Sequence, residues 1–218
     1  MASRIRGPVG IFHHMLRLRS LCVAGAIVLS AGQSSAVCAQ PPAASESPAV
    51  TAADIRFMQE MLGHHAQALQ MTALIATHTH RADLQALAER ITNTQSDEMA
   101  LMRRWLEVQR ATVPETHVMS GPDMSAMPGM SGPTVMPMMP GMLTPAQMAA
   151  LRAAKGPAFD RLFLRGMIQH HIGALTMVAA LNNTAGAAQE SAINRFVIDV
   201  DADQRAEIAR MRRMLSVR

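Results

Sequence analysis

The chain has 218 residues, with 20 Lys or Arg against 16 Asp or Glu, 20 methionines and two cysteines. The only charged residues of the first 39 positions are four arginines, so beyond them 16 basic and 16 acidic residues cancel. A chain without net charge gives no reason to expect nucleic acid or another polyanion as a partner.

The first 39 residues are predicted to be a secretory signal peptide. Arginines precede an apolar run over 21–31, and cleavage is expected near Ala39/Gln40 after a small-residue site. This run of about 11 residues is shorter than the roughly 20 that span a bilayer, so no membrane span is expected in the mature chain. The protein is therefore expected to be periplasmic or secreted. Lipid attachment at Cys38 stays open, although the bulky Val37 disfavours it.

Residues 40–50 are rich in Pro, Ala and Ser and are expected to form a disordered lead-in. Both cysteines, Cys22 and Cys38, leave with the signal peptide. A soft-metal site in the mature chain must then use thioether and imidazole groups, which tolerate an oxidising compartment better than thiols.

Residues 51–110 are expected to form a first pair of helices. The Thr51 hydroxyl can cap the amide three residues later, at the start of a helix that runs to about Thr77. A second helix starts near Asp83 and continues to about Arg110. Apolar residues recur with period 3.6 in both segments, which indicates amphipathic helices.

Two histidines lie where the first of these helices ends. His78 and His80 have no counterparts elsewhere in the chain. Histidines at helix ends interact favourably with the helix dipole, so a structural role is the preferred interpretation and metal binding stays open. His117, further along, is a better candidate ligand.

Residues 111–143 are predicted to be a linker rich in Met, Pro and Gly. Proline at this density forbids helix and central strand alike, and a disordered linker normally avoids apolar side chains. The methionines either pack as a loop on the bundle or capture Cu(I) or Ag(I) through mobile thioethers, and we favour capture. The candidate ligands here are Met124, Met127, Met130, Met136, Met138 and Met139.

Residues 144–218 are expected to form a second helix pair. Thr144, followed by proline and then by glutamine three residues later, is typical of a helix start. A short helix over 145–155 should lead into long helices over 158–182 and 187–216.

The two helix pairs are predicted to be copies of each other. Eight identities recur 106 positions later within 18 aligned positions: Asp54, Phe57, Met61, His64, His65, Ala68, Leu69 and Met71 match Asp160, Phe163, Met167, His170, His171, Ala174, Leu175 and Met177. In the following helices Gln95, Glu98 and Met102 match Gln204, Glu207 and Met211. An internal duplication and an all-α bundle of four helices follow.

Helical geometry brings the histidine pairs onto one face with methionines. At about 100° per residue, Met61, His64, His65 and Met71 share a face. The facing residues of each second helix are expected to contact the histidines: Glu98 and Met102 in the first copy, Glu207 and Met211 in the second. Imidazole and thioether without thiolate favour Cu(I) or Ag(I) over zinc. Glu98 and Glu207 are interpreted as groups that do not bind the metal themselves but orient an imidazole. The alternative is a set of core histidines that the carboxylates simply satisfy.

The second copy carries a recognisable motif. The stretch Phe163-Leu-Arg-Gly-Met-Ile-Gln-His-His-Ile-Gly-Ala174, followed by Gln204-x-x-Glu-Ile-x-x-Met211, resembles the domain of unknown function 305 family. This resemblance implies a ferritin-like helical bundle related to secreted copper-binding proteins. It also implies a metal-facing set: Met61, His64, His65, Met71, Met167, His170, His171 and Met177. The first copy departs from the motif at Gly63 and Met99.

Three classes of function are weighed. The leading expectation is a copper-binding protein for sequestration, tolerance or delivery, which prefers Cu(I), accepts Ag(I), catalyses nothing and meets other copper-trafficking proteins. A di-iron oxidase would need Glu-x-x-His motifs, and the chain contains none. A structural or adaptor bundle is the third, and it predicts no metal in the purified protein. The oligomeric state is not indicated.

Overall fold

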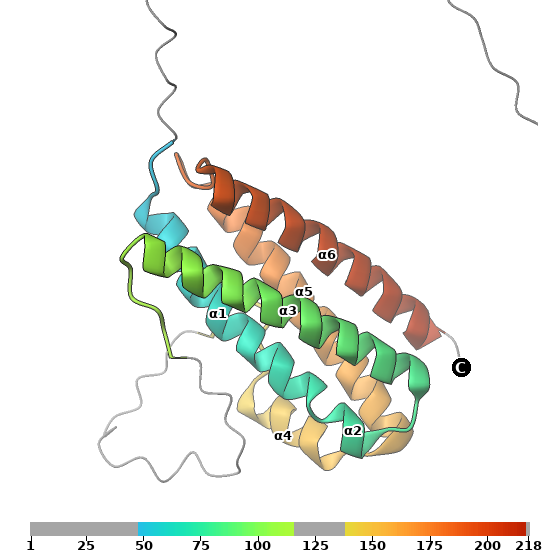
Figure 1. Ribbon diagram of the computed structural model, residues 1–218. Helices are drawn as coiled ribbons and strands as arrows, with labels where there is room; N and C mark the ends of the chain where they lie inside the picture. The colour runs from blue at the N-terminus through green and yellow to red at the C-terminus, as the bar shows by residue number, and fades with distance from the viewer. Residues whose placement is uncertain (1–47, 116–137, 217–218) are drawn as a thin grey trace, which may run out of the picture. The chain divides into compact units, whose positions relative to one another are not determined.

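Four long helices make up most of the described chain in the computed structural model (Figure 1). The structure describes residues 48–115 and 138–216, which belong to one compact unit. The long helices are α1 (Ala52–Thr72), α3 (Ala82–Val108), α5 (Gly156–Asn182) and α6 (Ser191–Ser216), and the short ones are α2 (Ile75–His78) and α4 (Pro145–Ala153). These residues contain no strand, so the all-α prediction is confirmed. The predicted signal peptide, most of the lead-in, His117, Met124, Met127, Met130 and Met136 lie outside them.

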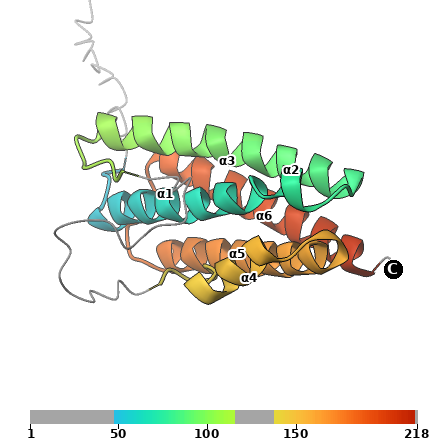
Figure 2. The ribbon, with the colours of Figure 1, turned by 90° about the horizontal axis from the view of Figure 1, so that it is seen from below.

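Neighbouring long helices run antiparallel. α1 packs along α3, α5 packs along α6, and α1 contacts α5. α1 and α6 point one way, and α3 and α5 point the other (Figures 1 and 2). None of the helices in the described ranges is long and apolar enough to cross a membrane.

Both predicted helix starts are confirmed. The Thr51 hydroxyl accepts a hydrogen bond from the Asp54 amide at 3.2 Å, and the Asp54 carboxylate accepts one from the Thr51 amide at 2.8 Å. Thr144 and Gln147 form the same reciprocal arrangement before α4. These boxes satisfy amides that have no partner inside the helix.

The first helix is shorter than predicted. α1 stops at Thr72, and α2 resumes at Ile75 instead of one helix continuing to Thr77. The Thr72 hydroxyl donates to the Leu69 carbonyl at 3.1 Å and accepts from the Thr92 hydroxyl at 2.8 Å. A threonine hydroxyl that binds the preceding turn competes with the helical hydrogen bonds.

The last helix begins later than predicted, at Ser191 instead of residue 187. The Asp54 carboxylate accepts a hydrogen bond from the Ala188 amide at 2.7 Å, and Ala188 has a left-handed φ of 55°. The Glu190 carboxylate then accepts from the Ala192 amide at 3.0 Å, close to the helix start. A long-range contact therefore holds 183–190 out of the helix.

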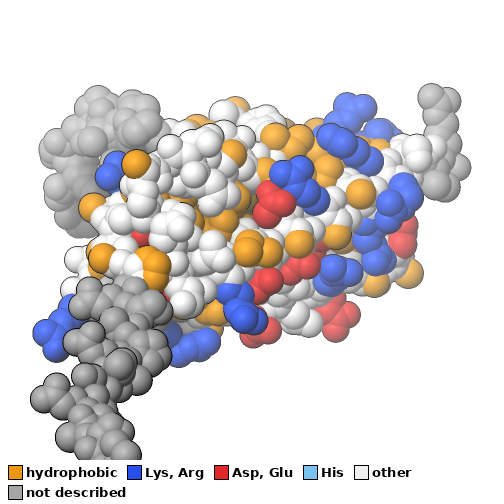
Figure 3. Space-filling model, turned by 90° about the horizontal axis from the view of Figure 1, so that it is seen from above, with side chains coloured by type: hydrophobic (Ala, Val, Ile, Leu, Met, Phe, Trp, Pro, Cys, Tyr) orange, Lys and Arg blue, Asp and Glu red, His pale blue; other side chains and the backbone are white. Residues whose placement is uncertain are grey.

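The core has two apolar halves at opposite ends of the bundle. One half contains Phe57, Met61, Met102, Trp105 and Phe196. The other contains Met71, Leu87, Phe163, Met167 and Met211. Charges of both signs mix with scattered apolar side chains on the face in Figure 3. The middle of the bundle, between the two halves, is polar.

Candidate metal centre

A buried polar layer crosses the bundle at mid-height. It consists of His64, His65, Gln95, Glu98, His170, His171, Gln204 and Glu207, two residues from each long helix. Seven of the eight are buried, and Glu98 is half-buried. Along α3, α5 and α6 these residues lie between those of the two apolar halves, and along α1 the histidines lie near the boundary, with Ala66 of the first half directly after them. Interiors rarely contain so many polar groups without a specific use.

The first histidines of the two pairs meet at the centre of the layer. The ring centroids of His64 on α1 and His170 on α5 are 3.8 Å apart, with the ring planes tilted by 37°. The two residues occupy equivalent positions in the duplicated sequence. A contact between equivalent residues of two antiparallel helices places an approximate two-fold axis between them.

The second histidine of each pair is hydrogen bonded to a carboxylate. His65 Nε2 donates to Glu98 at 2.6 Å, and His171 Nε2 donates to Glu207 at 2.6 Å. The predicted contacts between the histidine pairs and these two glutamates are therefore present. Such bonds fix the ring orientation and place a proton on Nε2.

His64 is held by a backbone group. Its Nε2 donates to the Pro140 carbonyl at 3.0 Å, which again leaves a lone pair on Nδ1. His170 is held less firmly, because neither of its ring nitrogens makes a hydrogen bond of good geometry in the described ranges, and the hydrogen-bonding effect of the His64 backbone is the weakest influence on its pKa.

Burial keeps the central histidines neutral. Desolvation, followed by the nearby His65, lowers the pKa of His64 from 6.5 to about 3, although the hydrogen bond to Pro140 acts the other way. Desolvation and the neighbouring His64 also lower the pKa of His170 well below 6.5. Neutral imidazole is the form that binds metal ions.

Many atoms of the layer lack hydrogen-bond partners among the described residues. The set comprises five ring nitrogens of the four histidines, together with Gln95 Oε1 and Nε2, Gln204 Oε1 and Glu207 Oε1. Arg90 reaches Glu207 Oε1 only at 3.7 Å. Each unpartnered buried group lowers the folding stability by about 1–3 kcal/mol, so the layer destabilises the fold unless a cation or ordered water binds to these atoms.

The six predicted helix methionines are buried, but they are grouped across the two copies. Met61 and Met102 share an apolar half with Met177, which comes from the other copy. Met167 and Met211 share the opposite half with Met71. The family resemblance implied that Met71 belongs with the first histidine pair and Met177 with the second. In the structure each of these two methionines lies with the methionines of the other copy. The cause is the antiparallel packing of α1 and α5, which puts the end of one helix beside the start of the other.

The end of the predicted linker is fixed against the histidines. We name residues 139–143 the strap. Gln67 donates to the Leu143 carbonyl at 3.0 Å and accepts from its amide at 2.7 Å. Gln169 donates to the carbonyls of Gly141 and Met142 at 3.3 Å each.

Glycines let the strap approach. A Cβ on Gly173 would overlap the Pro140 carbonyl, and one on Gly63 would meet the Met139 methyl group at 3.3 Å. Gly63 is equivalent to Gln169, and Gln67 to Gly173. The two copies therefore differ at the positions that hold the strap, which explains the departure at Gly63. Met139 is half-buried here and Met138 is exposed.

His78 has a structural role. Its Nε2 donates to the Arg152 carbonyl at 2.9 Å, its Nδ1 accepts from the Thr77 hydroxyl at 2.8 Å, and its ring contacts Phe159. Both ring nitrogens are engaged, which supports the structural interpretation. His80 is exposed.

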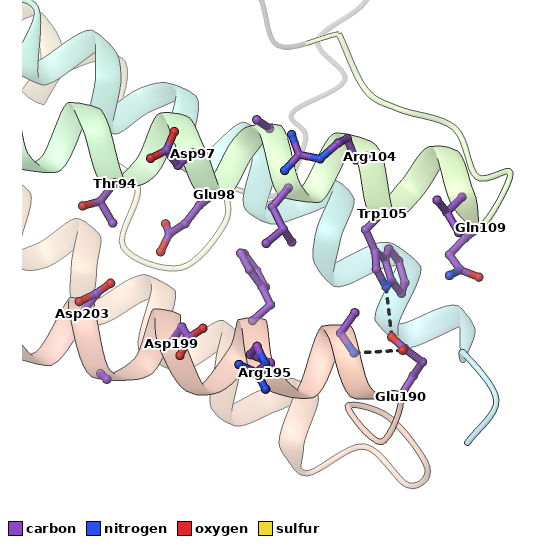
Figure 4. A pocket seen from close by; sticks show the side chains of 16 residues that line it. Thr94, Asp97, Glu98, Arg104, Trp105, Gln109, Glu190, Arg195, Asp199 and Asp203 are labelled. Carbon is purple, nitrogen blue, oxygen red and sulfur yellow. Dashed lines mark hydrogen bonds between the residues drawn. The ribbon is translucent and has the colours of Figure 1, made fainter. Parts of the chain in front are cut away.

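A groove of about 1090 Å³ lies between α3 and α6 (Figure 4). Glu98 lines this groove, so the polar layer borders the groove on this side of the bundle. Asp203 lines it too, and burial followed by the charges of Glu98 and Glu207 raises the pKa of that carboxyl. At one end Trp105 donates to Glu190 at 3.2 Å. The groove side of the layer is therefore acidic.

The described residues contain no group of three or more His, Cys, Asp or Glu side chains arranged to hold a metal ion. The donor set that they do contain consists of imidazole nitrogens in the layer and thioethers on either side. An ion of low coordination number that prefers soft ligands suits such a set better than zinc does. From the sequence, Gln95 was identified only as a matching position of the two copies, and Pro140 was missed because a backbone carbonyl leaves no sequence signal.

The chain matches a known protein family and several solved structures. The sequence profile of a family described as a domain of unknown function (DUF305) matches residues 54–215. A DUF305 fragment from Deinococcus radiodurans is 28% identical with a TM-score of 0.62, over 77% of this chain and 98% of that one. A DUF305 protein from Streptomyces coelicolor is 27% identical with a TM-score of 0.60, over 75% and 92%.

A third solved structure bears on metal binding. CopM in its Cu(II)-bound form is 26% identical with a TM-score of 0.54, over 74% of this chain and 94% of that one. CopM has also been solved in Cu(I)-bound and Ag-bound forms. A search of curated protein sequences finds no significant match.

Proposed function

Since this chain belongs to the DUF305 family, we propose that it is an exported protein that binds Cu(I), and also Ag(I), and catalyses no reaction. Its role would be copper sequestration, tolerance or delivery. Its partners would be metal ions and other copper-trafficking proteins.

The observation that carries the proposal is the buried polar layer. A bundle that needed only stability would fill this level with apolar side chains, because unpartnered buried polar atoms are costly. The layer instead holds four imidazoles with five ring nitrogens that have no partner in the described ranges. The likeness to CopM, solved with copper and silver, supports the choice of metal.

His64, His65, His170 and His171 are the proposed imidazole ligands, and the six buried helix methionines are the proposed thioethers nearest to them. Glu98 and Glu207 would orient His65 and His171, as their 2.6 Å hydrogen bonds already do. Bound copper would be held as a soft cation by uncharged ligands. Glu98 and Asp203 at the groove would attract a cation towards the layer.

The proposal includes the architecture and the location. The four long helices would form a ferritin-like bundle that arose by duplication of a helix pair. Export would follow from the signal-peptide pattern of residues 1–39.

A structural or adaptor bundle is the second candidate. It is favoured by the hydrogen bonds that satisfy one nitrogen in each of His64, His65 and His171. In that case no metal would change the stability of the protein. The lack of a well-formed hydrogen bond to either ring nitrogen of His170 in the described ranges argues against it.

Metal selectivity tests the proposal. Under anaerobic conditions Cu(I) and Ag(I) should bind much more tightly than Zn²⁺, because the donors are thioethers and neutral imidazoles. At a free metal concentration 100 times the Kd, binding should stabilise the fold by about 2.7 kcal/mol and raise Tm by roughly 5–10 °C. Chelator competition and thermal unfolding measure both effects. Equal competition by zinc would contradict the assignment of thioether ligands.

The linker makes a separate contribution in this proposal. Replacing Met119, Met124, Met127, Met130, Met136, Met138, Met139 and Met142 with Leu keeps apolar bulk and removes sulfur. The number of Cu(I) ions bound should fall, whereas helix content and Tm should hardly change. Elemental analysis and circular dichroism give the two readouts. An unchanged copper content would make the linker packing or spacer, and unfolding would make it part of the core.

A further inference from the structure

We propose that the two helix repeats share one metal ion, held by His64 and His170 on the approximate two-fold axis, instead of binding one ion each. This inference rests on the proposed function and makes it specific. The duplicated sequence by itself predicts two equivalent sites, one for each histidine pair. The structure places the first histidine of each pair next to the other, with ring centroids 3.8 Å apart.

Two ions cannot occupy this position independently. Two cations held on rings in such close contact would repel each other strongly in a buried environment of low dielectric constant. A single ion between the two imidazoles gains a ligand from each repeat and meets no such repulsion. The shared arrangement is therefore favoured over two sites that both use the central rings.

The hydrogen bonds divide the four histidines into two kinds. His65 and His171 are drawn towards α3 and α6 by Glu98 and Glu207. His64 and His170 stay between α1 and α5, where the repeats meet. We assign the shared ion to the central pair, and His65 and His171, the other two proposed ligands, lie outside this pair.

The binding atoms also follow from the contacts. The Pro140 carbonyl holds the Nε2 proton of His64, so its Nδ1 is the nitrogen that can bind an ion. The ring nitrogens of His170 make no hydrogen bond of good geometry within the described chain, and the hydrogen-bonding effect of the His64 backbone is the weakest influence on its pKa. The ring can therefore turn towards an ion at little cost. One anchored ligand and one that can turn allow an ion to enter between rings that now lie in tilted contact.

The test follows individual histidines by NMR, with Ag(I) as a probe that is not redox active. In the ¹⁵N-labelled protein without metal, His64 should show the form protonated at Nε2. On addition of Ag(I), the Nδ1 resonance of His64 and a ring nitrogen of His170 should shift together. Because each signal is assigned to one histidine, Ag(I) that binds to methionines elsewhere in the chain does not affect this readout.

The decisive variant is His170→Leu, read out at His64. Leu fills the space, and no hydrogen bond of good geometry is lost in the described chain, so the fold should survive; circular dichroism checks this. A shared ion predicts that the Ag(I) concentration needed to shift His64 rises by more than the ~10–100-fold expected for loss of a merely supporting group. The exposed His80→Leu serves as the control, and its His64 response should equal that of the wild type.

The outcomes separate the two proposals. A wild-type response of His64 in His170→Leu overturns the shared ion but leaves metal binding intact. If no histidine of the layer responds to Ag(I) in the wild type, both the shared ion and the proposed function fail. If the variant were unfolded, a wild-type titration in which His64 responds and His170 does not would also overturn the inference.

Discussion

The protein without metal is expected to lose much of its stability as the pH falls from 6.5 towards 4. In the unfolded chain each histidine takes up a proton below about pH 6.5, whereas folded His64 stays neutral down to about pH 3. The pKa of His170 is likewise lowered well below 6.5, first by burial. The unfolded state therefore binds more protons across this window, and stability rises with pH there.

The expected loss is large compared with the stability of a domain. Within this window each of the two groups lowers the free energy of unfolding by about 1.4 kcal/mol for every pH unit, so the two together lower it by roughly 3 kcal/mol per unit. The free energy of unfolding of a whole domain is roughly 5–15 kcal/mol. The stabilising contribution of the two groups is complete above pH 6.5 and is lost as the pH falls below it.

Urea unfolding at a series of pH values, with chelator present, measures this effect. The matched control is the double variant His64→Leu and His170→Leu, whose stability should change much less between pH 6.5 and 4. A wild-type stability that stays constant from pH 7 to pH 5 would show that these rings are not buried as described. Bound Ag(I) should protect the wild type against acid, since protons and metal compete for the same nitrogens.

The second large effect is expected from Gly173→Ala. The added Cβ would overlap the Pro140 carbonyl and contact Gly141, which are backbone groups that no side-chain rotation can move away. The strap must shift, and His64 then loses its hydrogen bond to Pro140. We expect a loss of about 3 kcal/mol in the free energy of unfolding, at the upper end of overpacking effects.

Gly63→Ala is the matched control. It is also a glycine inside a long helix beside the strap, but its Cβ would meet only the flexible end of Met139 at 3.3 Å. Alanine in a helix gains up to about 1 kcal/mol over glycine, so this variant should be neutral or slightly more stable. Urea unfolding compares the two variants. If Gly173→Ala proved as stable as Gly63→Ala, the strap would not be packed on α5.

The strap also explains a difference between the two repeats that sequence comparison alone leaves unexplained. Gln67 and Gln169 hold the strap by hydrogen bonds, and Gly63 and Gly173 admit it. Each pair of equivalent positions therefore has one glutamine and one glycine. One strap cannot contact both faces of a two-fold arrangement in the same way, so the duplicated copies diverged where it lies.

Local signals in the sequence predicted the parts of this protein that depend on local physics. The capping boxes at Thr51 and Thr144 need only neighbouring residues, and both are present. Helical periodicity predicted the four long helices and the approach of Glu98 to the first histidine pair, because residues three and four apart share a face. The 106-residue repeat identified the histidine pairs themselves.

Only the tertiary structure decided what depends on contacts between distant segments. The break after Thr72 and the late start of α6 arise from bonds to Thr92 and Asp54, which no local pattern encodes. The meeting of His64 with His170, and the exchange of Met71 and Met177 between the apolar halves, follow from antiparallel packing of α1 against α5. Periodicity predicts which face of a helix is buried, but packing decides which helix covers it, and here that choice turned two histidine pairs into one central layer.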